Sequence, residues 1–562
     1  MKLNYKRTIF VGFAFFLICA FWQAYDAIVP LMLTNKFGLS QGASGIIMSL
    51  DNILALFMLP LFGALSDKTD TRYGKRTPFI VVGAICAVLC FVGLSIVDTA
   101  QLKKLSSDQA TLWNTTMSAE VEYKENDSVI DANAQTQIVL KDYAAKMRFN
   151  KAYDELSAEE QTELAKWFAT ELSYDTVYTF DKNSGYTVYA SKTDAPEGHR
   201  TYNAYSALVS GATNIYASQI TKTQPFTLVL FIFLLLLTLI SMATFRSPAV
   251  ALMPDVTQKP LRSKANAIIN LMGTAGGILV LVLGMVFGTG SMRNQMMSYI
   301  WYVVAVGAIM LVALAIFVFN VKEKQWTAEA QSADDEAEQT EINDSEEEAT
   351  ELAEGKKGNE KLPKDKVRSL IFILASVALW FIGYNAITSK YSVYAVNVLD
   401  KDFNSTLLIA QAAAVVAYIP VGMIASKIGR KKTILAGIAM LTLAFFGAIF
   451  ITSSSPQWLL TLLFALAGIA WATINVNSFP MVVELAKGSD IGKYTGYYYT
   501  ASMAAQIVTP ILSGYLMQAF GTMGILFPYG TIFVALSFVT MLFVKHGDSR
   551  PSDIKEAIPD VD

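Results

Sequence analysis

The chain has 562 residues, of which 53% are hydrophobic and only 16% are charged. Soluble domains carry about 25% charged residues, so this composition excludes an ordinary soluble protein and favours a membrane protein. The formal net charge of −3 gives no indication of a nucleic-acid partner.

Twelve mostly apolar segments are long enough to cross a bilayer, which needs about 20 residues per span. Lipid cannot satisfy free backbone groups, so such segments form helices or a closed barrel, and their length and lack of alternation exclude the barrel. We therefore expect an all-α protein with twelve transmembrane helices in the lipid bilayer. The segments are residues 8–31, 43–65, 78–97, 225–252, 265–289, 298–320, 368–396, 405–425, 433–452, 457–483, 495–519 and 523–544.

Lysine and arginine residues gather in one alternating set of the loops between these segments. That set includes the two termini and the cluster around Arg72 and Arg76, whereas the other short loops hold little beyond Lys36, Arg293 and Lys401. An excess of Lys and Arg marks cytoplasmic loops. We therefore expect a multi-pass protein of the cell membrane with both termini in the cytoplasm.

A basic turn that contains glycine occurs twice, at Gly63–Arg76 and at Gly422–Lys432. Each copy follows an apolar segment with a proline just upstream, Pro60 or Pro420. A turn repeated once per half indicates two related halves, and such repeats place substrate sites between the halves near the bilayer midplane. The sequence therefore predicts two pseudo-symmetric six-helix bundles, and a transporter.

Two segments outside the predicted helices divide the chain further. The expected domains are helices 1–3 (1–97), an extracellular insert (98–224), helices 4–6 (225–320), an acidic cytoplasmic linker (321–366), helices 7–12 (367–545) and a cytoplasmic tail (546–562). The linker has low hydrophobicity and blocks of like charge, which favour a solvated tether that is disordered or weakly helical.

The insert between helices 3 and 4 is expected to be a small α/β domain. Ser157–Glu160 forms a capping box at the start of a helix. Val177–Phe180 and Tyr186–Tyr189 flank a short turn and predict a β-hairpin. Its aromatic side chains either form its core or stack on sugars, so the insert is a candidate contact for a glycan or another protein.

Four charged residues lie inside the predicted spans: Asp26, Asp51, Arg246 and Lys390. A charge at the bilayer centre costs about 2.5–3.5 kcal/mol on insertion scales, so such residues are functional candidates. Burial disfavours an ionised carboxyl group and a nearby arginine favours it, so Asp26, Asp51 and Arg246 are candidates for proton coupling. The alternative is a permanent ion pair that locks helices together. We expect Lys390 to extend its ammonium group to the outer surface.

Polar and aromatic residues near these charges suit the recognition of hydroxyl groups. Trp22 and Asp26 are one helical turn apart and share a face, with Gln23 beside it. In the second half, Trp471 and Asn475 begin a polar stripe that either resembles a sugar-facing wall or packs helices together. The candidate substrate-binding residues are Trp22, Gln23, Tyr25, Asn52, Tyr384, Asn385, Trp471, Asn475, Asn477 and Gln506.

The repeated turns are candidates for a gate. Asp67 lies beside a basic cluster with which it can form interhelix ion pairs that break when the halves move. Ordinary cytoplasmic topology explains the basic residues but not the glycine–acid–glycine spacing. Asp255 and Glu484 hold equivalent positions in the two halves. The candidate gating residues are Gly63, Asp67, Arg72, Gly74, Lys75, Arg76, Asp255, Gly422, Gly429, Arg430 and Glu484.

Three stretches resemble the major facilitator superfamily: Ser66–Phe79, Arg246–Asp255 and Gly468–Ala472. Within it they resemble the sucrose/proton-symporter-like branch and the related glycoside–pentoside–hexuronide:cation symporters. The resemblance covers nearly the whole chain except the linker and the insert. It implies two six-helix bundles, alternating access and cation-driven uptake of a glycoside or oligosaccharide.

One departure from the related symporters bears on the coupling ion. Relatives of the melibiose type place two acids on helix two, and the matching positions here are Ala55 and Leu59. This departure favours a proton over sodium. We expect neither another cofactor nor a resident metal ion.

The expected function is secondary active transport, namely proton-coupled uptake of a di- or oligosaccharide or glycoside by alternating access. One alternative is proton-driven export of a drug or metabolite. Another is a membrane receptor that does not transport and works through its external domain. An enzyme is not expected, because the sequence shows neither a nucleophile–base pair nor metal-ligand spacing.

Overall fold

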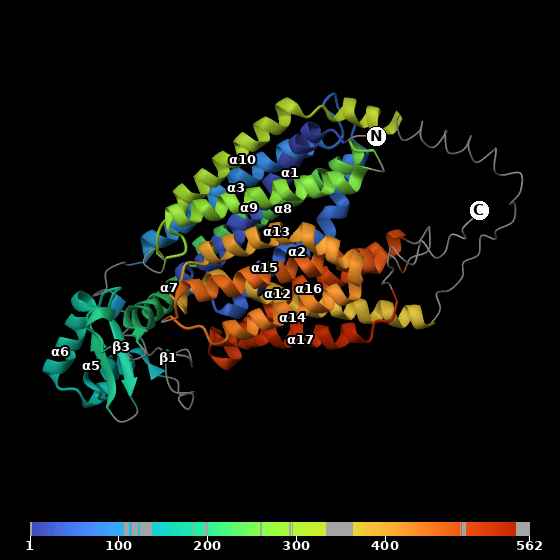
Figure 1. The fold of residues 1–562 in the computed structure, drawn as a ribbon. Helices are drawn as coiled ribbons and strands as arrows, with labels where there is room; N and C mark the ends of the chain where they lie inside the picture. Colours follow the sequence, from blue (N-terminus) through green and yellow to red (C-terminus); the bar gives the residue numbers. More distant parts are fainter. Residues whose placement is uncertain are drawn as a thin grey trace, which may run out of the picture.

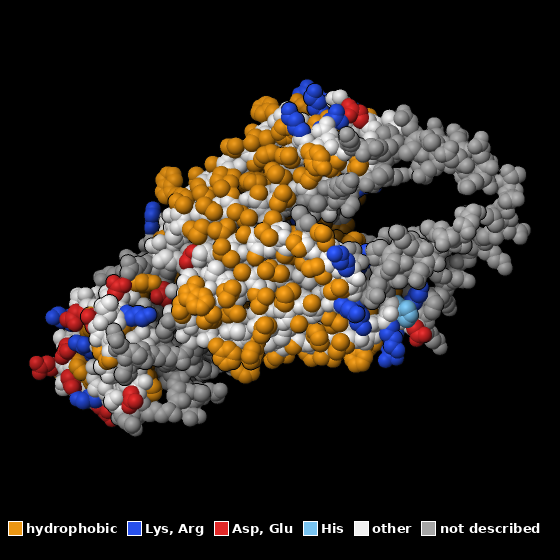
Figure 2. All heavy atoms as spheres, in the orientation of Figure 1, with side chains coloured by type: hydrophobic (Ala, Val, Ile, Leu, Met, Phe, Trp, Pro, Cys, Tyr) orange, Lys and Arg blue, Asp and Glu red, His pale blue; other side chains and the backbone are white. Residues whose placement is uncertain are grey.

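Long helices pack side by side into one elongated body, and the elements between α3 and α8 form a smaller unit at one of its ends (Figure 1). The structure is a computed structural model and describes residues 3–105, 112–114, 122–123, 138–181, 184–196, 201–258, 261–291, 294, 296–332, 364–453, 455–483, 485 and 491–546. Hydrophobic side chains cover the sides of the helical body, while charged side chains gather at its two ends (Figure 2). This distribution is that of a body surrounded by lipid.

Each segment predicted to span the membrane contains a helix. In the first half these are α1 (Tyr5–Leu31, continued by the π-turn η1, Met32–Lys36), α2 (Gln41–Asp67), α3 (Thr77–Lys104), α8 (Phe226–Asp255), α9 (Arg262–Phe287) and α10 (Ile300–Asn320). In the second half they are α12 (Lys364–Asn397), α13 (Phe403–Ile428), α14 (Arg430–Ala448), α15 (Gln457–Val483), α16 (Ile491–Phe520) and α17 (Leu526–Leu542), which follows the short turn η9 (Met523–Ile525).

Ten helices in the described part of the chain are long and apolar enough to cross a membrane. Helix α13 offers a shorter apolar stretch, Phe403–Tyr418, and α16 is not among the ten. The protein is therefore a multi-pass membrane protein, and a count of twelve spans stays a prediction.

The two halves pack their helices in the same pattern. In the first half α1 contacts α9 and α10, and α8 contacts α2 and α3. In the second half the equivalent helices repeat these contacts, because α12 contacts α16 and α17, and α15 contacts α13 and α14. The halves meet through α2 with α16, through α9 with α13, and through α1 with α12. The α2–α16 and α9–α13 interfaces are equivalent, because each joins the second helix of one half to the fifth helix of the other. This equivalence is expected for two related halves.

The unit between α3 and α8 contains both helices and strands. Its elements are β1 (Glu122–Tyr123), β2 (Ile138–Val139), α5 (Leu140–Phe149), α6 (Ala158–Lys166), β3 (Val177–Asp181), β4 (Gly185–Tyr189), β5 (Tyr202–Asn203) and α7 (Gly211–Thr223). The predicted hairpin is present as β3 and β4, antiparallel with Val177 opposite Tyr189. The predicted capping box of Ser157 and Glu160 begins α6.

This insert has a hydrophobic core of its own. Trp113 and Trp167 are 4% and 3% exposed and pack in that core, where Trp113 contacts Phe168 with ring centroids 4.8 Å apart. The aromatic side chains of the insert were expected either to form its core or to stack on sugars, and these two tryptophans form its core. They do not present faces on which a sugar could stack.

The start of the predicted linker packs against the first half. Residues 323–332 are helical, and the Glu323 carboxylate accepts hydrogen bonds from the backbone N–H groups of Lys75, Arg76 and Thr77 at 2.6–2.7 Å. Gly74, at φ 114°, gives this carboxylate room, since a Cβ there would lie 2.3 Å from Glu323 Cδ. Free N–H groups at a helix start favour such an anion.

The expectation of a solvated tether is therefore wrong for residues 321–332. It rested on the average composition of the linker, and a single acid that caps α3 does not alter that average. The rest of the linker, residues 333–363, lies outside the described residues.

Replacing Glu323 with alanine should destabilise the first half. The substitution leaves the buried N–H groups at the start of α3 without their charged acceptor, which should lower the free energy of unfolding by about 2–4 kcal/mol. Thermal unfolding of the purified protein measures the change. The control is Glu329→Ala, because the Glu329 side chain is 45% exposed and pairs with the exposed Arg7. Equal thermal stability of the two variants would contradict the capping role.

Candidate functional site

A cavity of about 460 Å³ lies between the two halves. Helices α1, α8 and α9 supply its wall from the first half, and α12, α13 and α15 supply most of the opposite wall. It is lined by six of the predicted site residues: Trp22, Gln23, Asp26, Arg246, Tyr384 and Trp471. The cavity therefore collects residues that are far apart in the sequence and come from both halves.

The wall from the first half combines an amide, a carboxylate and a cation. Trp22, Gln23 and Asp26 reach the cavity from neighbouring turns of α1. The Arg246 guanidinium carbon, from α8, lies 5.6 Å from the centroid of the Trp22 ring. This separation is within the range of a cation–π contact, which orients both side chains.

The wall from the second half carries a pair of aromatic rings. Tyr384 of α12 and Trp471 of α15 stack in parallel, with centroids 3.6 Å apart and an angle of 5° between their planes. Phe381 meets the Trp471 ring edge-on at 5.4 Å. The stacked pair is therefore held in one orientation, which is what a platform for a flat ligand face requires.

Gln411 of α13 joins the two walls and was missed by the sequence analysis. Its side-chain amide donates a hydrogen bond to Gln23 Oε1 of α1. Gly277 of α9 makes room for it, because a Cβ at that position would lie 3.0 Å from Gln411 Oε1. The only signal in the sequence was an amide inside an alanine-rich apolar segment.

A smaller cavity of about 100 Å³ adjoins the first and is lined by Asp26, Asp51, Asn52, Asn385 and Gln506, among others. The backbone N–H and the side-chain amide of Asn52 donate to Asp51 Oδ1 at 2.6 and 2.7 Å. Asp26 lines both cavities and forms part of the wall that they share. Among the described residues, no ion pair joins Arg246 to either acid, so the permanent pair considered as an alternative is not formed in this structure.

Three predicted binding residues lie elsewhere. Tyr25 is fully buried, packs against Trp22 at 5.3 Å, and lines neither cavity. Asn477 is 2% exposed and donates to the Thr473 carbonyl of its own helix at 2.9 Å. Asn475, which lines neither cavity, is half-buried. Of the two interpretations of this polar stripe, Asn477 fits helix packing rather than a wall that faces a sugar.

The first of the repeated turns forms an ion-pair network around Arg76. The guanidinium of Arg76 pairs with Asp67 of α2 and, at 2.9 Å, with Asp255 of α8. It also donates to the Gly63 carbonyl at 3.4 Å. Arg76 thereby ties the ends of α2 and α8 to the start of α3.

The neighbouring basic residues have other roles. Arg72 is exposed and stacks its guanidinium carbon over Tyr73 at 4.6 Å. The backbone N–H of Lys75 donates a hydrogen bond to the Glu323 carboxylate. The Lys75 side chain forms no ion pair with a described residue. Within this turn, Arg76 alone of the three predicted basic residues makes an ion pair in the described part of the chain.

In the second copy, Gly429 joins α13 to α14 at φ 92°, and Arg430 begins α14. A Cβ at Gly422 would have no neighbour within 4 Å. Glu484 lies outside the described residues.

The halves make their polar contacts at the end that carries the insert. Asn397 Nδ2 of α12 donates to Asn35 Oδ1 at 2.8 Å, and Asn404 Nδ2 of α13 donates to Thr289 Oγ1 at 3.1 Å. Nearer the middle of the helical body, Gln411 and Gln23 add one further hydrogen bond between the halves. The structure is therefore closed at the insert end.

Lys390 lies at this closed end and corrects one prediction. Its side chain is 0% exposed, and Nζ donates to the backbone carbonyl of Gln41 at 2.9 Å. The prediction that Lys390 reaches the outer surface is wrong, because position 390 of α12 faces the first turn of α2 in the other half. Hydropathy alone does not show which side of a span faces another helix.

Backbones of the two halves approach each other directly beside Lys390. A Cβ at Gly45 of α2 would lie 2.0 Å from the carbonyl oxygen of Pro510 of α16. A Cβ at Gly514 of α16 would lie 2.3 Å from the Gln41 oxygen. Closure of this end therefore depends on glycine at both positions.

This arrangement of two helical halves around a central cavity is that of a membrane transporter. Residues 5–527 match the MFS_1 like family, and the chain belongs to that family. The family and the relatives below are transporters rather than enzymes.

Two relatives match short segments. YagG of Escherichia coli K12, named as a candidate glycoside/cation symporter, is 40% identical over 68 residues, which are 12% of this chain and 15% of YagG. The proton-associated sugar transporter A of Mus musculus is 33% identical over 81 residues, which are 13% of this chain and 10% of the relative. The aligned segments thus span a small part of each relative.

A solved structure shares the fold over nearly the whole length. The crystal structure of a D-xylose-proton symporter superposes with a TM-score of 0.55 at 12% sequence identity and covers 97% of this chain and 99% of the symporter. At this identity the likeness shows the fold alone.

Replacing Gly45 with alanine should prevent the insert end from closing, because the added methyl group would overlap a backbone oxygen that cannot rotate away. A cysteine introduced at Ser513, which is 2% exposed here, should then react with an impermeant maleimide several-fold faster. The native cysteines are replaced in both proteins. Gly422→Ala is the control, since that position has open space. Unchanged reactivity in Gly45→Ala would show that closure does not need the glycine.

Proposed function

We propose that the protein is a secondary active transporter that takes up a sugar, a di- or oligosaccharide or glycoside, together with protons. The observation that carries this proposal is the central cavity, where a stacked aromatic pair faces amide, carboxylate and guanidinium groups. The names of the relatives, a glycoside/cation symporter and a proton-associated sugar transporter, agree with it.

The proposed topology has twelve spans in two six-helix bundles in the cell membrane, with both termini cytoplasmic and the α/β insert outside. The excess of basic residues in one set of loops supports this orientation. With the insert outside, a structure closed at the insert end is an inward-facing state. Alternating access would then open the insert end and close the other, with Arg76, Asp67 and Asp255 among the contacts that change.

Sugar binding would use both walls of the central cavity. The stacked rings of Tyr384 and Trp471 offer an apolar face to the C–H side of a sugar ring. Gln23 and Gln411, which bond to each other here, can turn to accept from and donate to hydroxyl groups. A bound sugar would replace that bond, and it would therefore bridge the two halves.

Proton coupling would use Asp26 and Asp51. Asp26 lines the cavity where the sugar would bind and also the smaller cavity that contains Asp51. A protonation change at either acid therefore alters the electrostatics at the sugar, and Arg246 adds a fixed positive charge to the same wall. Sodium is less favoured, because Ala55 and Leu59 supply no carboxylate where the melibiose-type relatives have two.

Two other functions lead to different results in the same assays. An exporter of hydrophobic cations would favour an apolar, acidic chamber, whereas this cavity contains Arg246 and paired amides. A receptor that works through its insert, by contact with a glycan or another protein, would bind without transport. Sugar-dependent proton movement, measured in proteoliposomes, is expected of the proposed sugar carrier and of neither the exporter nor the receptor.

Asp26→Asn and Asp51→Asn should each abolish accumulation of sugar against its gradient, because an amide cannot take up and release the coupled proton. Counterflow, which needs no proton gradient, should persist. Uptake of labelled sugar into proteoliposomes with an imposed pH gradient measures both. Asp70→Asn is the control, since the Asp70 side chain is 70% exposed and pairs with Lys324. Normal accumulation by both variants would mean that neither acid carries the proton.

Trp471→Ala should weaken sugar binding by about 2 kcal/mol, or roughly thirtyfold, because it removes one ring of the stacked platform. A panel of mono-, di- and oligosaccharides, with binding detected by thermal shift, first finds the ligand, and titration then gives the affinity. Trp458→Ala is the control, since Trp458 is 65% exposed. An unchanged affinity in Trp471→Ala would place the sugar elsewhere.

A further inference from the structure

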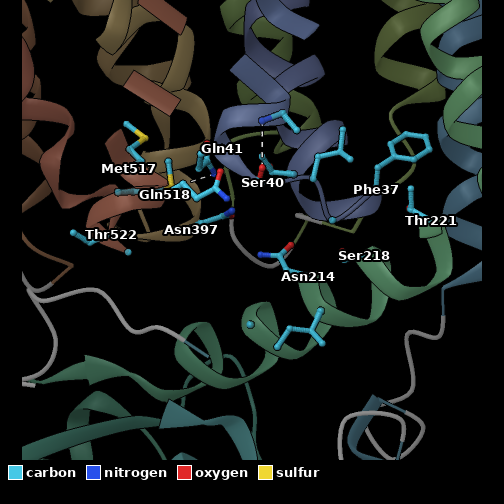
Figure 3. A pocket seen from close by; sticks show the side chains of 18 of the residues that line it. Phe37, Ser40, Gln41, Asn214, Ser218, Thr221, Asn397, Met517, Gln518 and Thr522 are labelled. Atoms are coloured by element: carbon cyan, nitrogen blue, oxygen red, sulfur yellow. Dashed lines mark hydrogen bonds between the residues drawn. The ribbon is translucent and has the colours of Figure 1, made fainter. Parts of the chain in front are cut away.

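A second cavity, of about 770 Å³, lies at the insert end, outside the closed contact between the halves. Figure 3 shows it between α7 of the insert and the ends of the long helices. Its walls come from the η1–α2 turn of the first half, from the end of α12 and from the α16–η9 turn of the second half, and from α7. The cavity thus has three walls, and the insert supplies one of them.

Helix α7 is fixed in place above this cavity. The turn before α2 passes so close to α7 that a Cβ at Gly38, at φ 61°, would lie 2.2 Å from the backbone nitrogen of Ser218. Gln101 of α3 donates to Thr221 Oγ1 of α7 at 3.3 Å. On the other side, the insert contacts the second half, where Tyr174 donates its hydroxyl hydrogen to Asp400 Oδ1 at 2.5 Å. The wall is therefore part of the folded structure.

The lining is rich in uncharged hydrogen-bonding groups. It has amides on three sides, at Asn214 of α7, Gln41 of α2 and Gln518 of α16, and it contains no aspartate or glutamate among the described lining residues. The amides of Asn214 and Gln518 make no hydrogen bond to any described residue, and Gln41 Oε1 is buried without a partner. Figure 3 shows Asn214 projecting from α7 toward this space, across from Gln41 and Gln518.

We infer that this cavity is an outer binding subsite for a neutral polyhydroxylated solute, and specifically for the free sugar before it passes the gate. The inference rests on the proposed function. The amides of Asn214 and Gln518, which lack hydrogen-bond partners among the described residues, border a space whose described lining has no carboxylate. They match the donors and acceptors of sugar hydroxyl groups and offer little to an ion. A charged solute would meet only Lys222 among the lining residues.

The floor of this subsite is also part of the gate. Gln41 lines the cavity with its side chain, and its backbone carbonyl accepts the hydrogen bond from the buried Lys390. Because the walls belong to both halves, opening the insert end changes the subsite and joins it to the central cavity. A sugar held here is positioned to move inward when the gate opens.

The test removes the amides and keeps their size. Asn214→Leu/Gln518→Leu is compared with Gln219→Leu, which lies on α7 but does not line the cavity. Binding of glucose, sucrose and raffinose to the full-length protein in nanodiscs is measured by calorimetry, in the parent and in a Trp471→Ala background. Uptake kinetics are measured with the same sugars.

We expect Trp471→Ala to keep a weaker binding event, and the double substitution to reduce the affinity of that event about tenfold, as the loss of two hydrogen bonds predicts. In the parent background, the KM of uptake should rise several-fold at an unchanged maximal rate, and Gln219→Leu should have no effect. A cysteine at Ser218 should be protected from maleimide by the bound sugar, which tests the site without disturbing either amide.

Two results would overturn the outer subsite and leave the proposed function intact. One is sugar binding and uptake in the double variant equal to those of the parent. The other is no protection of the cysteine at position 218 by a sugar that the parent binds. If none of the sugars binds or is transported by the parent, the proposed function fails with it.

Discussion

The direct approach of backbones between α2 and α16 is the contact on which the closed end depends. At Gly45 and Gly514 the main chains of the two halves come so close that no side chain would fit. Side-chain contacts could adjust gradually as the halves move, whereas a main-chain contact without intervening side chains is either made or broken. This constraint favours two discrete arrangements of the halves rather than a continuous range.

Around that contact, several polar groups find partners across the boundary between the halves. Lys390 gives its hydrogen bond to a carbonyl of the other half, and Asn35 and Asn397 pair side chain to side chain. In an apolar surrounding, a group that loses such a partner must find another, because an unpaired polar group is costly. Water that enters an opened end can supply one. If this end opens, as the proposed alternating access requires, the same groups that hold it closed become hydrated.

Much of the helical body could be predicted from the sequence. Long apolar segments can form only helices in lipid, so each predicted span contains a helix, and the hairpin of the insert followed from alternation around a turn. The central cavity was predicted in part, because Asp26 and Arg246 are charges that a membrane segment retains only for a reason. Its stacked rings and the bond between Gln23 and Gln411 could not be predicted, since they depend on how two distant helices rotate toward each other.

The errors have one physical origin. The prediction for Lys390 rested on hydropathy, and the prediction for the linker that contains Glu323 rested on its average composition. Both side chains bond to backbone groups that are distant along the chain. Tyr25 lies on the same helix as three predicted residues that line the central cavity, yet it is fully buried and does not line that cavity. Sequence spacing shows which residues share a face, but the partner that covers that face is set by the tertiary packing.

The insert is continuous in sequence with the first half only, and it nevertheless bonds to the second half through Tyr174 and Asp400. The insert is therefore joined to the first half by the chain itself and to the second half by a non-covalent contact. Any motion that separates the halves at this end must break the hydrogen bond between Tyr174 and Asp400, and the bond must form again when the halves return. Under the proposed alternating access, the strength of this contact would set how long the closed state lasts, and so the insert would influence the rate of transport.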